Sequence, residues 1–229
     1  MVRAHAGPQN SIKSGGVFYF IKMQNITTLI FDFGGVIINL KTEEDWFKED
    51  LLPNFQPEKL QELQQAHFFQ HFETGKISTQ DFIQQLKNIA IDSTISDEEI
   101  IQHWNGILQE IPQHRVDLLQ QLRKRYQLIL LSNTNEIHVE KFTKDMQEKF
   151  GEDILETNFH TVYYSQEIGL RKPNKEIYEF VLREQKLQPE YCFFFDDKAE
   201  NLTEPKKLGI RTMLIDFNKL SKLTLAHFL

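Results

Sequence analysis

The sequence contains only one cysteine, Cys192, among 229 residues. A single cysteine cannot form a disulfide within the chain, which excludes a disulfide-stapled secreted fold. Because Cys192 lies in the apolar run 191–195, the pattern favours a buried, inert thiol over a nucleophile. In the absence of a disulfide framework, we expect the protein to be cytoplasmic.

The sequence also lacks an apolar run long enough to cross a bilayer, and it shows no internal repeat. Lys and Arg number 26 against 33 Asp and Glu, which gives a formal net charge of -7. Nucleic acids and anionic membranes select basic surfaces, so we expect neither as a partner. The negative net charge does not exclude a small anionic ligand, because a few hydrogen-bond donors at the site outweigh the screened charges of distant residues.

Residues 1–22 do not read as part of a folded domain. They hold Arg3, Lys13 and a short apolar patch at 17–21, which is too short for the core of a signal peptide. We expect a disordered or vector-derived leader, with Met23 as an alternative start. The composition, with 40% hydrophobic and 26% charged residues, predicts a globular protein of one large domain or one domain with an insert.

The chain is organised around residues 29–39, an apolar run interrupted by Asp32 and then by Gly34 and Gly35. A short apolar run bounded by turn residues is typical of a strand buried on both faces of a parallel sheet. Ligands of open α/β sheets lie beyond the carboxyl ends of the strands, which is where Asp32 stands. An Asp that closes a strand also serves as an ordinary turn residue, so this residue alone does not decide the function.

Residues 41–109 change to helical spacing. Ser78 is predicted to cap one helix, and Ser96 with Glu99 forms a predicted capping box at the start of another. Pro112 disfavours helix at the residue before it and closes the block. A helical insert after the first strand predicts a small subdomain over that strand's end, either a lid or an inert insert.

Strands and helices alternate in the second half of the chain. A second buried strand is predicted at 128–131, and further strands are predicted at 160–164, 191–195 and 211–215. A helix is predicted to begin at Pro173, and another to end at Gly209. This alternation predicts a Rossmann-like, doubly wound α/β fold with about five parallel strands. We expect a core of residues 23–40 and 110–229 with a helical cap at 41–109.

Three predicted strands end in polar residues: Asp32, the cluster 132–135, and the pair Asp196 and Asp197. The carboxyl ends of parallel strands meet at one edge of the sheet, so we expect these groups to converge. Two adjacent carboxylates repel each other and are unfavourable as a purely structural pair. A cation between them and Asp32 removes that repulsion, so the sequence predicts a metal site.

Four motifs in this order and spacing resemble the haloacid dehalogenase (HAD) superfamily. They are Asp-Phe-Gly-Gly-Val at 32–36, Leu-Ser-Asn at 131–133, Lys-Pro at 172–173 and Phe-Asp-Asp at 195–197. The resemblance covers residues 24–215 and includes a helical cap after the first motif. Within the superfamily, the sequence is most similar to the bacterial alpha-D-glucose-1-phosphate phosphatase subgroup, through 132–135, 171–173, 194–197 with Asn201, and the cap segment 71–78.

The resemblance implies a magnesium-dependent phosphatase that acts on a small phosphomonoester, such as a sugar phosphate. A carboxylate can attack phosphorus and hold it as an aspartyl phosphate, which splits one displacement into two. Asp32 is the implied nucleophile. Mg²⁺ takes oxygen ligands and usually only a few protein groups; the implied ligands are Asp32, Asp197 and the backbone carbonyl of Gly34. Asp196 is implied as a further ligand or as an acid behind them.

The remaining implied site residues contact the phosphate. Lys172 supplies a point charge for its oxygens, and the hydroxyl of Ser132 and the amide of Asn133 are neutral donors. Ser132 and Lys172 are therefore expected to be catalytic together with Asp32. The expected partner is a small phosphorylated metabolite, and the chain is expected to be a monomer or a small homo-oligomer.

One position departs from the pattern. The family's phosphatases usually carry a second Asp two residues after the nucleophile, as general acid and base, and this chain has Gly34 there. General acid–base catalysis is typically worth about 10²–10⁴-fold. The resembling subgroup also has Gly and is active. Candidate replacements are His138, His67, His71 and Glu73, or a metal-bound water. A leaving group of low pKa, such as an anomeric hydroxyl, needs less protonation and favours sugar 1-phosphates.

Two other functions stay open at this point. Because Gly34 removes the usual acid, the chain is alternatively a catalytically weak protein that binds a phosphorylated ligand. A hydrolytic dehalogenase that uses Asp32 is disfavoured, since attack on carbon needs no metal and leaves Asp196 and Asp197 without a role.

Overall fold

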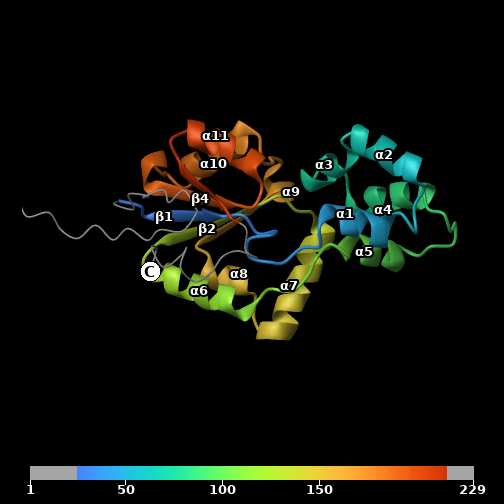
Figure 1. Ribbon diagram of the computed structural model, residues 1–229, viewed down its shortest axis with the longest axis horizontal. Helices are drawn as coiled ribbons and strands as arrows, with labels where there is room; N and C mark the ends of the chain where they lie inside the picture. The colour runs from blue at the N-terminus through green and yellow to red at the C-terminus, as the bar shows by residue number, and fades with distance from the viewer. Residues whose placement is uncertain (1–24, 216–229) are drawn as a thin grey trace, which may run out of the picture.

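A five-stranded parallel sheet forms the centre of the protein, in the order β3-β2-β1-β4-β5 (Figure 1). The computed structural model describes residues 25–215, and the predicted leader at 1–22 lies outside them. The strands are β1 (Thr28–Phe31), β2 (Gln127–Ser132), β3 (Thr161–Tyr164), β4 (Cys192–Asp196) and β5 (Arg211–Leu214). The predicted α/β fold class, with its parallel doubly wound sheet, is confirmed.

The strand register aligns the ends of the three central strands. Phe31 of β1 pairs with Leu130 of β2 and with Phe195 of β4. The residues that follow these positions therefore leave the sheet at one edge. The register thus sets Asp32 beside Asp196.

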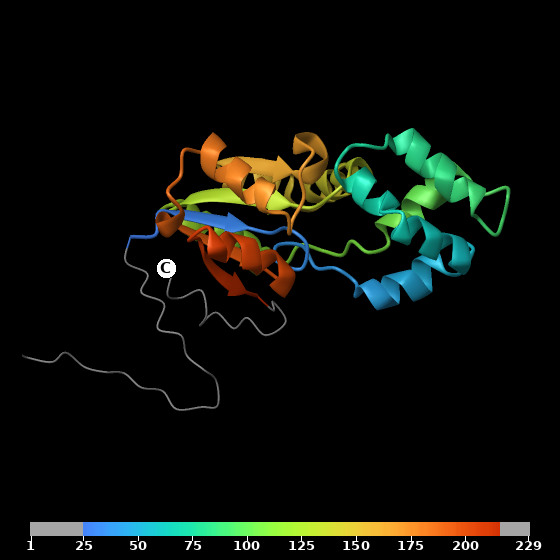
Figure 2. The same cartoon turned by 90° about the horizontal axis from the view of Figure 1, so that it is seen from above.

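Helices cover both faces of the sheet (Figures 1 and 2). They are α6 (Gln113–Arg123), α7 (Glu136–Phe150), α8 (Ile154–Asn158), α9 (Ser165–Ile168), α10 (Lys175–Glu184) and α11 (Thr203–Lys207). Successive residues of a strand point to opposite faces. Accordingly Phe193 and Phe195 pack in the cluster under α6, α7 and α8, whereas Phe194 packs in the cluster under α10. All the central strands are apolar because both faces are covered.

The helices between β1 and α6 form a separate group beyond the carboxyl ends of the strands (Figures 1 and 2). They are α1 (Glu43–Trp46) with a π-helical turn (Phe47–Leu51), α2 (Pro57–Gln65), α3 (Phe68–Glu73), α4 (Thr79–Asn88) and α5 (Asp97–Asn105). Ser78 accepts a hydrogen bond from the backbone of Asp81, and Ser96 forms a complete capping box with Glu99. Both predicted helix starts are confirmed.

This helical group has its own hydrophobic cluster. Phe82 is fully buried in it and packs against the rings of Phe68, Phe72 and Trp104, with 3.9 Å between the centroids of Phe72 and Phe82. Ile137 of α7 joins the same cluster. The helices therefore rest on α7 of the sheet domain while they keep a core of their own.

Two predicted helix boundaries are wrong by two residues. The helix expected to end at Gly209 is α11, which ends at Lys207 with Leu208 as its C-cap. The helix expected to begin at Pro173 is α10, which begins at Lys175 with Asn174 as its N-cap. Residues 171–174 form a turn in which the backbone N–H of Asn174 donates to the carbonyl of Arg171. This turn, rather than a helix, carries Lys172 to the sheet edge.

Two further expectations concern the single cysteine and membrane-spanning segments. Cys192 is fully buried, and burial raises the pKa of its thiol to about 12, as expected for an inert cysteine. No helix in residues 25–215 is long and apolar enough to span a membrane.

The packing around Phe82 predicts a large loss of stability on truncation. We expect Phe82→Ala to lower the free energy of unfolding by about 3–5 kcal/mol, because it leaves a cavity among stacked rings. Chemical denaturation measures this change. Ile91→Ala is the matched control, since Ile91 is 60% exposed, and its effect should stay within about 0.5 kcal/mol. Equal stabilities for the two variants would contradict the assignment of Phe82 to a packed core.

Candidate active site

Asp32 stands at the end of β1, at the centre of the sheet edge. Its backbone N–H donates to the carbonyl of Phe195 at 2.9 Å, which extends the pairing with β4. Its carboxylate accepts a 2.7 Å hydrogen bond from the backbone of Phe33 and a 2.7 Å ion pair from Lys172 Nζ, both at Oδ1. Only 7% of the residue is exposed. The carboxylate is thus held in one orientation by the backbone N–H of Phe33 and by Lys172.

Three carboxylates meet at this edge. Oxygens of Asp32, Asp196 and Asp197 all lie within 4.8 Å of one another. Asp32 comes from β1 and the other two from the end of β4, so the residues are far apart in sequence and are brought together by the parallel register. The structure therefore brings together the acids that the sequence predicts to converge.

Asp196 and Asp197 differ in their surroundings. Asp196 is fully buried, and both its oxygens accept hydrogen bonds: Oδ1 from the backbone of Lys198 and from Asn201, and Oδ2 from Lys172 Nζ and from Asn201. In contrast, Oδ1 of Asp197 is buried and has no hydrogen-bond partner among residues 25–215. Asp196 thus supports the site, whereas Asp197 keeps an oxygen free for a ligand.

The electrostatics of the site favour a cation. Burial raises the pKa of Asp32 to about 7; Lys172 opposes this rise and Asp196 adds to it. Burial also raises the pKa of Asp197, and the charge of Asp196 raises it further. A hard divalent cation prefers carboxylate oxygens and would stabilise the charged form of both groups. The unpartnered oxygen of Asp197 and the carboxylate of Asp32 fit such an ion.

The glycine loop after Asp32 approaches Asp197 closely. Gly35 has a φ of +68°, and a Cβ on it would lie 2.2 Å from Oδ2 of Asp197. Glycine adopts such a left-handed conformation without strain. At Gly34, a Cβ would lie 2.9 Å from the side chain of Leu40, so a residue with a side chain there requires Leu40 to move. The carbonyl of Gly34 stays a predicted ligand.

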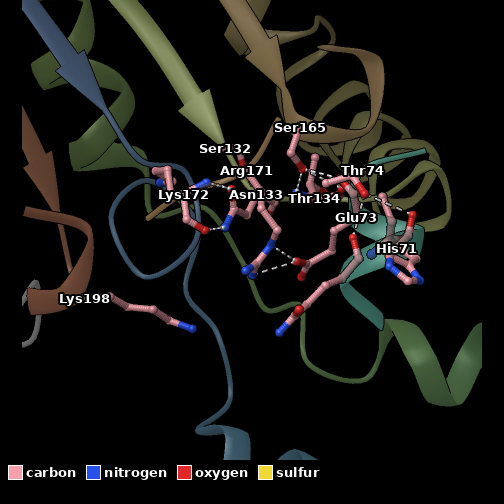
Figure 3. Close-up of polar contacts among 12 residues, drawn as sticks. His71, Glu73, Thr74, Ser132, Asn133, Thr134, Ser165, Arg171, Lys172 and Lys198 are labelled. Atoms are coloured by element: carbon pink, nitrogen blue, oxygen red, sulfur yellow. Dashed lines mark hydrogen bonds and ion pairs between the residues drawn. The ribbon is translucent and has the colours of Figure 1, made fainter. Parts of the chain in front are cut away.

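Lys172 is held by its backbone as well as by its charge. The side chain of Asn133 accepts a hydrogen bond from the backbone N–H of Lys172 and donates one to its carbonyl, each at 2.9 Å (Figure 3). The Nζ of Lys172 bridges Asp32 and Asp196 at 2.7 and 2.8 Å, and the side chain is 1% exposed. The two carboxylates outweigh the effect of burial and raise the pKa of this lysine, so it remains charged.

Asn133 and Ser132 differ in whether their side chains are already hydrogen-bonded. The side-chain amide of Asn133 is engaged with Lys172, and its role as a phosphate donor stays a prediction. The hydroxyl of Ser132 makes only a 3.5 Å contact to the carbonyl of Asn133, at the limit of a hydrogen bond. Ser132 is 2% exposed and keeps its donor available for a ligand oxygen.

Comparisons with known proteins establish the family of this chain. A family model described as haloacid dehalogenase-like hydrolase matches residues 26–209. The chain belongs to this hydrolase family. The resemblance stated from the motifs is confirmed for the family. The expected enzyme class was a phosphatase, and the family model confirms that the chain is a hydrolase. The finer subgroup stays a prediction.

Relatives of this HAD chain include a characterised phosphatase and solved structures. A D-ribitol-5-phosphate phosphatase from Bacteroides thetaiotaomicron is 30% identical over 190 residues, covering 82% of this chain and 90% of the relative. A HAD family enzyme from the same organism, solved with magnesium and inorganic phosphate, is 32% identical with a TM-score of 0.75 over 87% of this chain and 98% of that chain. A HAD-like hydrolase from Porphyromonas gingivalis is 27% identical, with a TM-score of 0.75 over 89% and 97%.

The structure bears on the histidines suggested to replace the acid–base residue, whose usual position is occupied by Gly34. His138 is partly buried, and desolvation lowers its pKa to about 4, so its ring is neutral rather than an imidazolium acid at neutral pH. Its ring nitrogens contact the side chain of Asn135 and the carbonyl of Trp104. The suggestion of His138 as the acid is therefore wrong, because its nitrogens are used in a structural network. His67, the N-cap residue of α3, and His71, within α3, are both exposed.

Three residues in this site make contacts that the sequence did not predict, although Glu73 was a candidate for the acid–base group. Asn201 holds both oxygens of Asp196, and Glu73 pairs with Arg171 across the space between α3 and the turn before α10. Asn201 and Arg171 belonged to the motif resemblance, but a motif does not say which side chain another one holds. Those contacts depend on the packing of distant segments.

Substitution of Gly35 should weaken metal binding. We expect Gly35→Ala to reduce the affinity for Mg²⁺ by about tenfold or more, because its methyl group displaces the carboxylate of Asp197 from the ion. Isothermal titration calorimetry measures this affinity. Gly151→Ala is the matched control, since Gly151 has a similar φ of +77° but no atom within 4 Å of its Cβ position. Unchanged affinity in Gly35→Ala would remove Asp197 from the ligand set.

Proposed function

We propose that this HAD chain is a magnesium-dependent phosphatase that hydrolyses a small phosphomonoester through an aspartyl phosphate on Asp32. The observation that carries this proposal is the convergence of Asp32, Asp196 and Asp197 around one point with Lys172 beside them. The characterised relative that acts on D-ribitol 5-phosphate and the neighbour solved with magnesium and phosphate support it.

The proposed metal ligands are the carboxylates of Asp32 and Asp197 and the carbonyl of Gly34, with Asp196 behind them. When bound, Mg²⁺ neutralises the repulsion between a carboxylate nucleophile and a phosphate dianion. Asp196 keeps its hydrogen bonds to Lys172 and Asn201 in this arrangement. Its role is thus to fix the position of the lysine.

The protein groups perform two displacements. An oxygen of the Asp32 carboxylate attacks phosphorus, and the P–O bond to the substrate alcohol breaks. Water then attacks the aspartyl phosphate, which releases inorganic phosphate and restores the carboxylate. Lys172 and the hydroxyl of Ser132 donate to the phosphate oxygens and stabilise the charge that develops on them. Asn133 holds the backbone of Lys172 so that its ammonium stays beside Asp32.

The proposed substrate class is a sugar or polyol monophosphate. The core residues recognise only phosphate and metal, so the organic part of the substrate is left to the helical group. Because Gly34 cannot protonate the leaving alkoxide, a leaving group of low pKa favours sugar 1-phosphates within this class. Glu73 of α3 stays a candidate for the missing proton donor, with burial raising its pKa and Arg171 opposing the rise.

We further propose that residues 41–109 are a cap on a core of residues 23–40 and 110–229. The helical group lies beyond the strand ends that carry Asp32 and Asp197 (Figure 2). Its own hydrophobic cluster allows it to move as a unit on α7. Such a cap would exclude water from the aspartyl phosphate until the alcohol has left.

The alternative proposal is a catalytically weak protein that binds a phosphorylated ligand. Gly34 favours it, because the position of the usual acid has no side chain. Both proposals include binding of magnesium and phosphate, so only turnover separates them.

Replacement of the nucleophile should abolish hydrolysis. We expect Asp32→Asn to lower kcat for p-nitrophenyl phosphate by at least about 10⁴-fold, because an amide does not attack phosphorus. Asp117→Asn is the control, since Asp117 is an exposed carboxylate of α6. Circular dichroism checks that both variants fold. Full activity in Asp32→Asn would remove Asp32 as the nucleophile, and a wild-type protein without any turnover would favour the phospho-ligand binder.

Metal dependence separates the phosphatase from a dehalogenase. We expect EDTA to abolish phosphate release from a panel of sugar phosphates and excess Mg²⁺ to restore it, since the carboxylate otherwise meets an unscreened phosphate dianion. The measurement is colorimetric phosphate release, with halide release from 2-chloropropionate assayed in parallel. Halide release that persists in EDTA, without phosphate release, would overturn the phosphatase.

A further inference from the structure

An ion pair joins the helical group to the turn that carries Lys172. Arg171 donates from Nε and Nη2 to one oxygen of Glu73, at 3.2 and 3.0 Å (Figure 3). The two side chains are only 24% and 27% exposed. Glu73 is the last residue of α3, whereas Arg171 directly precedes Lys172, so the pair spans 98 residues of sequence. The contact thus links the helical group to the residue next to the proposed catalytic lysine.

Ser165 makes a second link at the same place. It is fully buried at the start of α9, and its hydroxyl accepts a hydrogen bond from the backbone N–H of Thr134 at 3.0 Å. The hydroxyl has one proton, and two carbonyls lie within its reach: that of Glu73 at 2.5 Å and that of Thr134 at 3.1 Å. The hydroxyl of Ser165 can therefore donate its proton either to Glu73 in the helical group or to Thr134 in the sheet domain.

Gly75 makes the third link. A Cβ on this residue would lie 2.4 Å from the backbone oxygen of Gln166 in α9, and its φ is +66°. The chain after α3 thus runs against α9 with no room for a side chain. We call this boundary the α3–α9 seam, formed by Glu73 and Gly75 on one side and by Ser165, Gln166 and Arg171 on the other.

The seam continues into the phosphate-binding residues. Ser165 holds Thr134, which follows Asn133, and the side chain of Asn133 holds both backbone polar groups of Lys172. Arg171 is bonded covalently to Lys172. The ammonium of Lys172 lies 2.7 Å from Asp32 at the other end of this path. Two routes therefore lead from the end of α3 to the lysine, one through the arginine and one through the serine.

We propose that the α3–α9 seam lets the closed position of the cap set the placement of Lys172, so that Glu73 and Arg171 are positioning residues for the lysine. This inference rests on the proposed phosphatase function and on the proposed cap. When the cap is seated, Arg171 is fixed from the side of α3 and Lys172 from the side of Asn133. When the cap leaves, Ser165 turns its proton to Thr134 and Arg171 loses its partner. Full catalytic placement of the lysine thus coincides with a covered site.

A double-mutant cycle on the ion pair tests this role. We expect Glu73→Ala and Arg171→Ala each to lower kcat for p-nitrophenyl phosphate by about tenfold and to raise KM to the same extent in both variants, and we expect the double variant to lose no more than either single variant. The reason is that each change removes the same restraint on Lys172. Glu73→Gln, which keeps a hydrogen-bond acceptor, should recover part of the loss.

The matched control is a second ion pair between the helical group and the sheet domain in residues 25–215, Glu43 with Lys198 at 2.6 Å. Its side chains are 74% and 51% exposed, and exposed pairs contribute little. Glu43→Ala should therefore leave kcat within about twofold of the wild-type value. Thermal unfolding of all variants checks that any loss of kcat is not a loss of folded protein.

Gly75→Ala tests the seam without any change of charge. Its methyl group cannot fit against Gln166, so the seam should open and kcat should fall as it does in Arg171→Ala. Gly151→Ala, with a similar φ and open space around it, controls for the strain of a left-handed residue. Activity of Gly75→Ala equal to that of Gly151→Ala would contradict the proposal.

Two outcomes of the cycle would overturn the inference. Additive losses, or a raised KM in Arg171→Ala alone, would show that Arg171 binds the substrate directly. Unchanged kcat in both single variants would show that the ion pair only joins the helical group to the sheet domain and does not position Lys172. Either result leaves the phosphatase itself intact, because wild-type turnover with Mg²⁺ decides that question separately.

A readout that does not need turnover covers the case of an inactive wild-type protein. The two tryptophans of the chain, Trp46 and Trp104, both lie in residues 41–109, and the ring of Trp104 stacks on His138 of α7 at 5.7 Å. Because the proposed cap seats over bound phosphate, the fluorescence of these tryptophans is the signal followed in a titration with inorganic phosphate in the presence of Mg²⁺. We expect the Glu73 and Arg171 variants to bind phosphate about tenfold more weakly than Glu43→Ala, since a displaced lysine holds the anion less well. Equal affinities would overturn the proposal.

Discussion

The mutual repulsion of three carboxylates is the constraint on which this site depends. Asp32, Asp196 and Asp197 lie within 4.8 Å of one another at the edge of a buried sheet, where water screens their charges poorly. Lys172 compensates part of this charge through its ion pairs with Asp32 and Asp196. One oxygen of Asp197 remains buried and without a partner in the described part of the chain. The arrangement is therefore complete only with a further positive charge.

The fold provides the rigidity that such an arrangement requires. Strands β1 and β4 pair in register and are apolar on both faces, so their ends cannot separate without exposing the core. Asn201 fixes Asp196, and Asn133 fixes the backbone of Lys172, so the repelling groups are held by hydrogen bonds from several segments. The position of each charge is thus set by neutral polar groups around it.

The central elements and the acids could be predicted from the sequence because their signals are local. Apolar runs mark β1, β2 and β4, and the residues that end them are Asp32, Ser132 and Asp196, which parallel pairing must bring to one edge. The capping box at Ser96 is also a local pattern, since both of its hydrogen bonds join residues three apart. These predictions needed only periodicity and the geometry of parallel sheets.

The contacts that could not be predicted join residues far apart in the chain. The sequence marks Glu73 and Arg171 separately, as an acid–base candidate and as part of a motif, but nothing in it pairs them. The turn at 171–174 resembles the start of a helix because proline is common in the first turn of helices. His138 follows the polar cluster 132–135 and looks available, but its ring stacks on Trp104 of α5 and its nitrogens contact Asn135 and the carbonyl of Trp104. In each case the packing of the helical group on the sheet domain decides the role.

Diffraction from crystals grown with Mn²⁺ in place of Mg²⁺ tests the central claim most directly. Mn²⁺ prefers the same oxygen ligands and scatters anomalously, so its position does not depend on interpretation of weak density. The account predicts one anomalous peak within reach of the carboxylates of Asp32 and Asp197 and of the carbonyl of Gly34. A peak elsewhere, or none at this edge of the sheet when the ion saturates the protein in solution, would contradict it.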